Sequence, residues 1–215
     1  TFDSLDTSWE DLLCQSEMDT IFLTPGWQRL WWEHFGSEAG LLLLSFHDGD
    51  DHIGIAPLQR RDHEITFLGD TDLFDYHDFL VPQGSEASFY RALFNYLSTA
   101  EWHTLDLMSL PEESPTLRCI PALAEKMGYS VEVREEGMAP FASLPPTWEE
   151  YLANLSKKDR HELRRKLRRL ESETDFHIQQ LDDVESISEA MDDFLQLMAQ
   201  SREEKAEFLT DERGE

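Results

Sequence analysis

The sequence predicts an α/β (α+β) fold in which helices flank a mixed sheet. Three observations predict it. Residues 41–68 contain three apolar runs separated by turn-forming residues, which is typical of an antiparallel meander. Residues 86–97 place apolar side chains at helical spacing. Residues 102–134 then follow the order strand, helix, strand, which favours a parallel pair joined by a crossover.

A helix is expected to begin after Thr24, because this hydroxyl can cap the helix and Pro25 suits its first position. Gly36 is expected to end it. Apolar residues recur on one face, which predicts that this face packs in the core, with Trp32 beside it. The residues of that face are Trp27, Leu30, Trp31 and Phe35.

Strands are expected at residues 41–47, 52–59 and 64–68. The turn 48–51 reads Asp-Gly-Asp-Asp, a composition typical of a hairpin. After an aspartate-rich segment, the helical pattern spans 86–97.

A buried strand at 102–107, a helix at 115–127 and an alternating strand at 129–134 complete the first domain. Prolines at 140, 145 and 146 indicate a boundary, so we expect a first domain at 1–146.

A helical linker at 147–173 should follow, with a break near Ser156. We expect 174–215 to start a second domain that stops early, with a strand at 176–181 and an amphipathic helix from Val184. The apolar face of this helix requires a partner surface, either a second copy or another protein.

The 215 residues include 45 acidic and 18 basic side chains, a formal net charge of −27. Such a field repels nucleic acid, anionic lipid and nucleotide wherever basic residues are not concentrated. Cys14 and Cys119 supply no metal knuckle or disulfide framework. With no apolar run long enough for a membrane span and no signal peptide, we expect a cytoplasmic protein.

Eight of the 18 basic residues fall within the 13 positions 157–169. Lys157, Lys158, Arg160 and Arg164 are the candidate phosphate contacts of this basic helix. The helix could instead dock onto an acidic surface, or be a solvated face that neutralises an acidic neighbour.

The segment 70–78 holds the densest set of oxygen and imidazole side chains, but its spacing departs from the EF-hand pattern and we expect no metal. Its aspartates could form turns and caps. Alternatively, Asp75, Tyr76 and Asp78 are candidate substrate contacts in a cleft, because polar groups at a strand end often bind ligands.

Signatures of nucleophilic catalysis and of phosphate-binding glycine loops are missing from the sequence. His103 and His177 lie in strand patterns, which favours a packing role over that of a general base.

Several phrases together resemble GNAT-type acyltransferases, specifically the bacterial CelD/BcsL-like proteins associated with cellulose or exopolysaccharide biosynthesis, distant relatives of the FemABX transferases. The phrases are 22–27 (FLTPGW), 75–79 (DYHDF) and 158–166 (KDRHELRRK). The resemblance implies a GNAT-like first domain and an N-acyltransferase that uses acetyl-CoA or another acyl-CoA. It also implies an amine-bearing small molecule or sugar precursor as the acceptor.

The glycine loop that binds the cofactor pyrophosphate in that family, Q/R-x-x-G-x-G/A, does not occur here. The resemblance therefore implies an acyl-CoA site outside this chain, and a chain that is inactive alone. A non-catalytic GNAT-like binding module remains open, as does a transferase that takes aminoacyl-tRNA through 157–169, although the net charge disfavours nucleic acid. The acidity itself fits either a salt-tolerant source or a basic partner.

Overall fold

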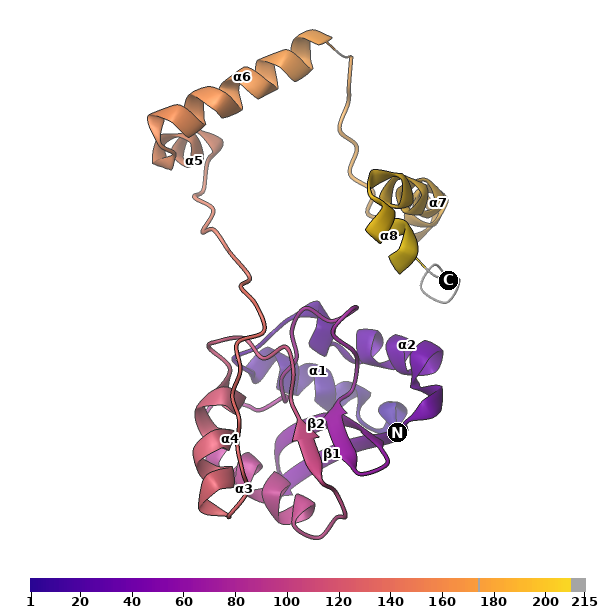
Figure 1. Cartoon of the computed structure of the whole chain (residues 1–215), viewed down its shortest axis with the longest axis vertical. Coiled ribbons are helices and arrows are strands. Elements are labelled where there is room, and N and C mark those ends of the chain that lie inside the picture. The colour runs from indigo at the N-terminus through magenta and orange to yellow at the C-terminus, as the bar shows by residue number, and fades with distance from the viewer. Residues whose placement is uncertain (174, 210–215) are drawn as a thin grey trace. The chain divides into compact units, whose positions relative to one another are not determined.

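The computed structural model describes residues 1–173 and 175–209 (Figure 1). The chain divides into two compact units, Thr1–Gly137 and Met138–Glu215. The change of unit falls shortly before the boundary expected at residue 146. Of the expected second domain, residues 174 and 210–215 lie outside the described residues.

A four-stranded mixed sheet with strand order β1-β2-β3-β4 forms the centre of the first unit, which confirms the predicted fold class. β1–β2 and β2–β3 pair antiparallel, as the predicted meander requires, and β3–β4 pair parallel. The strands are β1 (Gly40–Asp48), β2 (Asp51–Arg61), β3 (Glu64–Phe67) and β4 (Thr104–Asp106).

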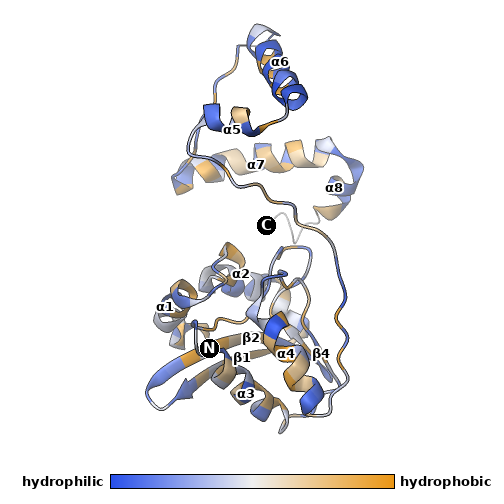
Figure 2. Ribbon diagram, turned by 90° about the vertical axis from the view of Figure 1, so that its left-hand side faces the viewer, coloured by the Kyte–Doolittle hydropathy of each residue, from blue (hydrophilic) through white to orange (hydrophobic). Residues whose placement is uncertain are grey.

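The sheet lies between two helical layers, which Figure 2 shows from the side. In β1, Leu42 and Leu44 pack with α3 and α4, whereas Leu41 and Leu43 face α1 and α2. This follows from the alternation of side chains along a strand. The helices are α1 (Asp6–Gln15), α2 (Pro25–Phe35), α3 (Glu86–Leu97) and α4 (Pro115–Lys126), with short 3₁₀ turns at Phe2–Ser4, Ile21–Leu23 and Gly36–Glu38.

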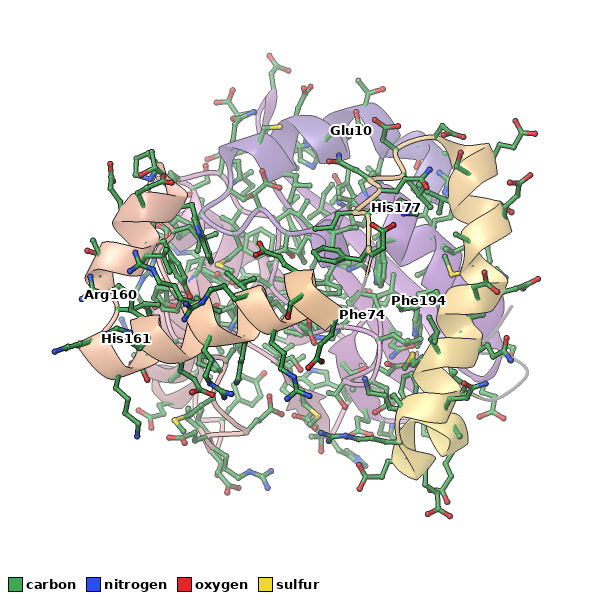
Figure 3. All side chains as sticks on the ribbon, turned by 90° about the horizontal axis from the view of Figure 1, so that it is seen from above. Glu10, Phe74, Arg160, His161, His177 and Phe194 are labelled. Carbon is green, nitrogen blue, oxygen red and sulfur yellow. The ribbon has the colours of Figure 1, made fainter. Side chains whose placement is uncertain are left out.

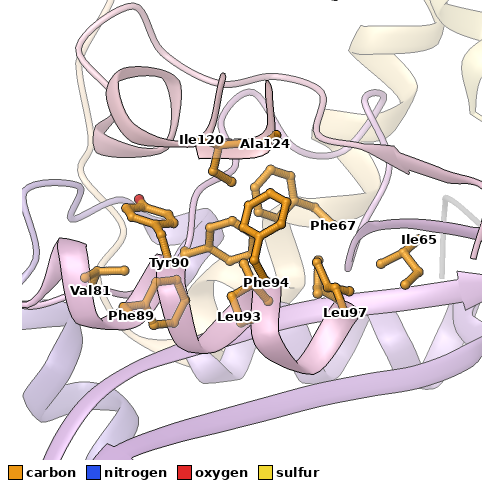
Figure 4. Close-up of a cluster of buried hydrophobic side chains, with 13 residues drawn as sticks. Ile65, Phe67, Val81, Phe89, Tyr90, Leu93, Phe94, Leu97, Ile120 and Ala124 are labelled. Atoms are coloured by element: carbon orange, nitrogen blue, oxygen red, sulfur yellow. The ribbon is translucent and has the colours of Figure 1, made fainter. Parts of the chain in front are cut away.

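The larger apolar cluster lies on the α3 face of the sheet (Figure 4). Phe89, Leu93 and Leu97 of α3 are each fully buried there. Full burial of such side chains stabilises a fold by roughly 1.5–3 kcal/mol each relative to exposure. The second cluster is formed by α1, α2 and the other face of the sheet, with Trp9 at its centre.

Helix α2 begins and ends as predicted, with the backbone N–H of Trp27 donating to the Thr24 hydroxyl at 3.3 Å. Its predicted core face is only partly correct. Trp31 is 6% exposed, but Leu30 is 57% exposed. Helix α1 carries no proline or glycine punctuation at its ends, and sequence reasoning missed it.

The strand predicted at residues 129–134 is wrong, because these residues form no strand in the structure. Tyr129 and Val131 nevertheless pack against the larger cluster. The alternation in the sequence therefore reflects partial burial of two of its apolar residues, while Val133 is 63% exposed, and the backbone pairing that a strand requires is missing from these residues.

In the second unit, α5 (Trp148–Asn154) and α6 (Lys157–Glu173) are separated at Ser156, as predicted. The helix expected from Val184 is α7 (Val184–Ser201), and α8 (Glu203–Phe208) follows it. The strand expected at 176–181 is wrong: these described residues are extended without pairing. A β-strand requires backbone hydrogen bonds to a neighbouring strand, so an alternating sequence alone does not form a strand.

Candidate functional site

The parallel strands β3 and β4 end side by side, and the chain leaves the sheet there. Leu68 still donates its backbone N–H to the carbonyl of Pro57 in β2, at 2.9 Å. The chain returns to β2 at Leu80, which exchanges two backbone hydrogen bonds of 2.9 and 3.0 Å with Ile55. We call the intervening residues 69–79 the excursion. Ligands of α/β proteins commonly bind beyond the carboxyl ends of parallel strands, so this is the place to seek a site.

Asp70 opens the excursion and has a structural role. One carboxylate oxygen accepts the backbone N–H groups of Asp72 and Leu73, at 2.9 and 2.7 Å. The other accepts the indole N–H of Trp31 in α2, at 2.9 Å. Both oxygens are therefore used in forming the turn and in attaching it to α2.

Asp78 closes the excursion and is fully buried. Its carboxylate accepts hydrogen bonds from the hydroxyl groups of Ser114, at 2.7 Å, and Thr116. Its own neighbour, Phe79, donates a backbone N–H at 2.8 Å. The Tyr90 hydroxyl lies 2.9 Å from that of Thr116. When Asp78 is ionised, the single hydroxyl proton of Thr116 is committed to it, so Tyr90 must be the donor to Thr116.

Burial raises the pKa of Asp78, and the hydrogen bonds from Thr116, Ser114 and Phe79 oppose that rise. The same burial raises the pKa of Tyr90. These groups join the excursion to α3 and α4, and none of the carboxylate of Asp78 faces solvent. Asp78 thus fits the capping and turn-forming interpretation better than that of a substrate contact.

His77 is buried as a sandwich between two aromatic rings. Its ring lies parallel to Phe74 and Phe67, with centroid separations of 4.6 and 5.3 Å. Burial lowers its pKa to about 4, while Asp70 and the backbone near Leu68 and Met108 oppose the shift. Within the described residues, neither ring nitrogen makes a hydrogen bond of good geometry. The imidazole is therefore neutral near pH 7, which suits a packing role.

Ser109 lies just beyond β4 in a left-handed conformation, with φ of 58°. Its carbonyl accepts the backbone N–H of His77 at 2.9 Å, and its own N–H donates to the Glu136 carboxylate at 2.6 Å. A non-glycine residue held at positive φ stores strain that often accompanies a functional site. Glu136 is exposed and adds a carboxylate at this edge of the sheet.

Asp75 and Tyr76, the two predicted contacts other than Asp78, are accessible in the excursion, as are Thr71 and Asp72. Asp75 is exposed, and Tyr76 is half-buried. The ring of Tyr76 lies edge-on to Phe22, at 6.4 Å between centroids, and Phe22 in turn contacts Trp27 at 5.4 Å. Beneath them Phe74 is buried, and Figure 3 labels it among the side chains of the unit. An exposed carboxylate that precedes an accessible aromatic residue in the chain suits a cationic or amine-bearing ligand.

The four candidate phosphate contacts are on α6, in the other unit. Lys157, Lys158 and Arg164 are exposed and Arg160 is half-buried; Figure 3 shows Arg160 and His161 on this helix. Farther along α6, Glu162 and Glu173 form ion pairs with Arg165 and Arg169, at 2.9 and 3.0 Å. Part of the positive charge is therefore balanced within the helix, and the unbalanced part lies toward its first half.

The sequence predicted a packing role for His103 and His177, but both side chains are exposed. His103 precedes β4 and stacks on His63 with a centroid distance of 4.4 Å, but it is exposed. His177 is exposed in an unpaired segment. In residues 1–173 and 175–209, no group of three or more His, Cys, Asp or Glu side chains is arranged to hold a metal ion.

Sequence reasoning missed Ser114, Thr116, Ser109 and Glu136. The pair Ser114-Pro115 was a usable signal, because a capping hydroxyl before proline marks a helix start. Its contact with Asp78 could not be read from the sequence, because 36 positions separate the two residues.

No family model matches the chain, and neither a curated protein nor a solved structure matches it. The resemblance to GNAT-type acyltransferases therefore stays a prediction. Among the helices that the structure describes, none combines the length and apolarity needed to cross a bilayer.

Proposed function

We propose that this chain carries the acceptor side of an acyl-CoA-dependent N-acyltransferase of the GNAT type, acting in exopolysaccharide or cell-envelope biosynthesis. The observation that carries the proposal is the position of Asp75 and Tyr76 on the excursion, at the carboxyl end of the parallel pair. The order of three antiparallel strands, a helix and a parallel strand also supports it. Acetyl-CoA or another acyl-CoA would bind outside these 215 residues.

The charge of the site favours an amine over the phosphates of a cofactor. Asp72, Asp75 and Glu136 are exposed carboxylates at this edge of the sheet, and they would repel a pyrophosphate. An ammonium group is attracted by the same carboxylates and by the faces of aromatic rings. Asp75 would bind and orient the amine, and the ring of Tyr76 would pack against the body of the acceptor.

The chemistry requires an uncharged amine at the moment of attack, so the bound ammonium group first loses one proton to solvent water. Its nitrogen forms a bond to the acyl carbon, the carbon–sulfur bond breaks, and the proton lost by the amine leaves with the thiol of CoA. Donors near the acyl oxygen stabilise the oxyanion that forms on the way. In this proposal those donors belong to the acyl-CoA site, and this chain supplies recognition of the acceptor.

Glucosamine and glucose form a matched pair of probes, because they differ by one amine. We expect glucosamine to shift the NMR signals of residues 70–76 in the full chain, and glucose to leave them unchanged. Asp75→Asn should weaken glucosamine binding by roughly 2–5-fold, the range of an exposed ion pair. Asp50→Asn, an exposed carboxylate in the β1–β2 turn, is the control and should leave binding unchanged.

Catalysis is tested separately by following CoA thiol release from acetyl-CoA with the natural protein and glucosamine. Release that depends on Asp75 supports the transferase. Glucosamine binding without any release favours the second candidate, a non-catalytic binding module. That candidate is supported by the sequence, which lacks the glycine loop that binds the cofactor pyrophosphate in GNAT-type transferases. Equal binding of glucose and glucosamine would overturn both readings of the site.

A further inference from the structure

The β1–β2 hairpin carries a polar cluster that the proposed function does not use. Ser45 and His47 lie two residues apart on β1, so their side chains lie on the same face of the strand. His52 is the partner of His47 across the hairpin. The pairing shifts between Phe46 and His47, a bulge of the kind that redirects side chains.

The three side chains converge on one point. The Ser45 hydroxyl oxygen lies 3.1 Å from Nε2 of His47 and 2.9 Å from Nε2 of His52. The two imidazole rings are stacked, with centroids 4.4 Å apart and planes inclined by 12°. His47 is exposed and His52 is half-buried, so solvent reaches the cluster from one side.

We propose that Ser45, His47 and His52 form a binding site for a borderline divalent transition-metal ion such as Zn²⁺ or Cu²⁺. Imidazole nitrogen is a preferred ligand of these ions, and two imidazoles on facing strands can chelate one ion when both rings turn out of the stacked arrangement so that their Nε2 lone pairs converge. The hydroxyl of Ser45, within hydrogen-bond distance of both nitrogens, orients the rings or supplies an oxygen ligand. Water would complete the coordination on the exposed side.

The surroundings favour a cation. Asp48 and Asp51 are paired in the register immediately beyond the two histidines, and Asp50 lies between them in the turn. Figure 2 shows this turn as a hydrophilic end of the hairpin.

A second histidine pair in the same unit provides a matched control. His63 and His103 also stack at 4.4 Å between centroids, and both are exposed. They share no hydroxyl group of the kind that Ser45 provides, within the described residues. A general affinity of stacked histidines for metals would therefore act at both pairs, whereas the proposed site requires the hairpin.

The test is a calorimetric titration of Zn²⁺ and Cu²⁺ into the full chain, without a polyhistidine tag and with excess Mg²⁺ to occupy carboxylates. We expect one ion per chain. His47→Asn and His52→Asn should each weaken binding about tenfold or more, and Ser45→Ala should weaken it by a smaller factor. The double variant His63→Asn/His103→Asn should bind as the wild type does.

NMR provides a second readout, because ion binding should shift the imidazole signals of His47 and His52 before those of His63 and His103. Absence of binding in the presence of Mg²⁺ would overturn the proposal. So would binding that survives both hairpin substitutions, or that is lost equally in the His63/His103 variant.

Discussion

Single buried side chains explain how the excursion keeps its shape. His77 is 3% exposed between two aromatic rings, and Asp78 beside it is 0% exposed. Burial lowers the pKa of His77 and raises the pKa of Asp78, because it disfavours the charged form of each side chain. Burial therefore opposes ionisation of both residues, whereas the hydrogen bonds from Thr116, Ser114 and Phe79 favour the ionised carboxylate of Asp78.

For His77 we expect an acid-dependent loss of stability. Its pKa falls from 6.5 in the unfolded chain to about 4 in the folded chain, so the unfolded state binds more protons between these values. The contribution of His77 is complete above pH 6.5 and decreases as the pH falls toward about 4, by roughly 3 kcal/mol. His77→Leu should remove this part of the pH dependence, measured as the difference between urea unfolding curves.

Histidine NMR titration gives an independent check that does not depend on how the variant folds. The His77 signals should remain those of the neutral ring at pH 5.5, because burial lowers its pKa to about 4. A His77 that is largely protonated at pH 5.5 would contradict the buried assignment.

At the scale of elements, hydroxyl caps connect local sequence to tertiary structure. Ser114 caps α4 by accepting the N–H of Thr116 at 3.0 Å, and it donates to Asp78 at 2.7 Å. The cap was readable from Ser114-Pro115 in the sequence, but the carboxylate that it meets was not. The strands predicted at 129–134 and 176–181 were wrong for a similar reason. Alternation shows which residues are apolar, but whether a segment pairs as a strand depends on residues elsewhere in the fold.

Ser114→Ala should therefore cost more than a cap alone. Loss of one donor to a buried carboxylate typically destabilises by about 1–3 kcal/mol, and the loss should be greater at pH 7 than at pH 4, because only the ionised form needs both donors. Ser85→Ala is the matched control, since Ser85 precedes α3 without a side-chain cap bond. It should change the free energy of unfolding by less than about 0.5 kcal/mol. Similar losses for the two variants would show that the Asp78 contact contributes nothing.

At the scale of the whole molecule, the two main features are the high negative charge and the exposed apolar side chains. The net charge of −27 sets up repulsion that the folded state must tolerate. The antiparallel part of the sheet, the helices α2, α3 and α4 and the break at Ser156 could all be predicted, because turns and caps are encoded locally, whereas α1 was missed. The buried hydrogen bonds of Asp78 with Ser114 and Thr116 could not be predicted, because these residues lie far apart in the chain. The apolar side of α7 is exposed, with Phe194 at 59% and Leu197 at 67%.

Salt should separate the two explanations of the acidity. Raising NaCl from roughly 0.1 M to about 1 M shortens the Debye length from about 10 Å to about 3 Å and weakens repulsion among the carboxylates. If the acidity is an adaptation to salt, the melting temperature should rise by several degrees over this range, and an uncharged osmolyte at equal osmolality should raise it less. A melting temperature that is insensitive to NaCl would favour an acidic surface kept for a basic partner.

The excursion also bears on how this protein could acquire a new specificity. The chain pairs with β2 at Leu68, opposite Pro57, and again at Leu80, opposite Ile55, so residues 69–79 are topologically an insertion between two neighbouring pairing positions of β2. Residues near its two ends, Asp70 and Asp78, anchor it, whereas Asp72 and Asp75 in between are exposed. The exposed positions Asp72 and Asp75 can therefore change, and with them the ligand that this loop selects, while the buried side chains of Phe74 and His77 keep the loop attached to the core.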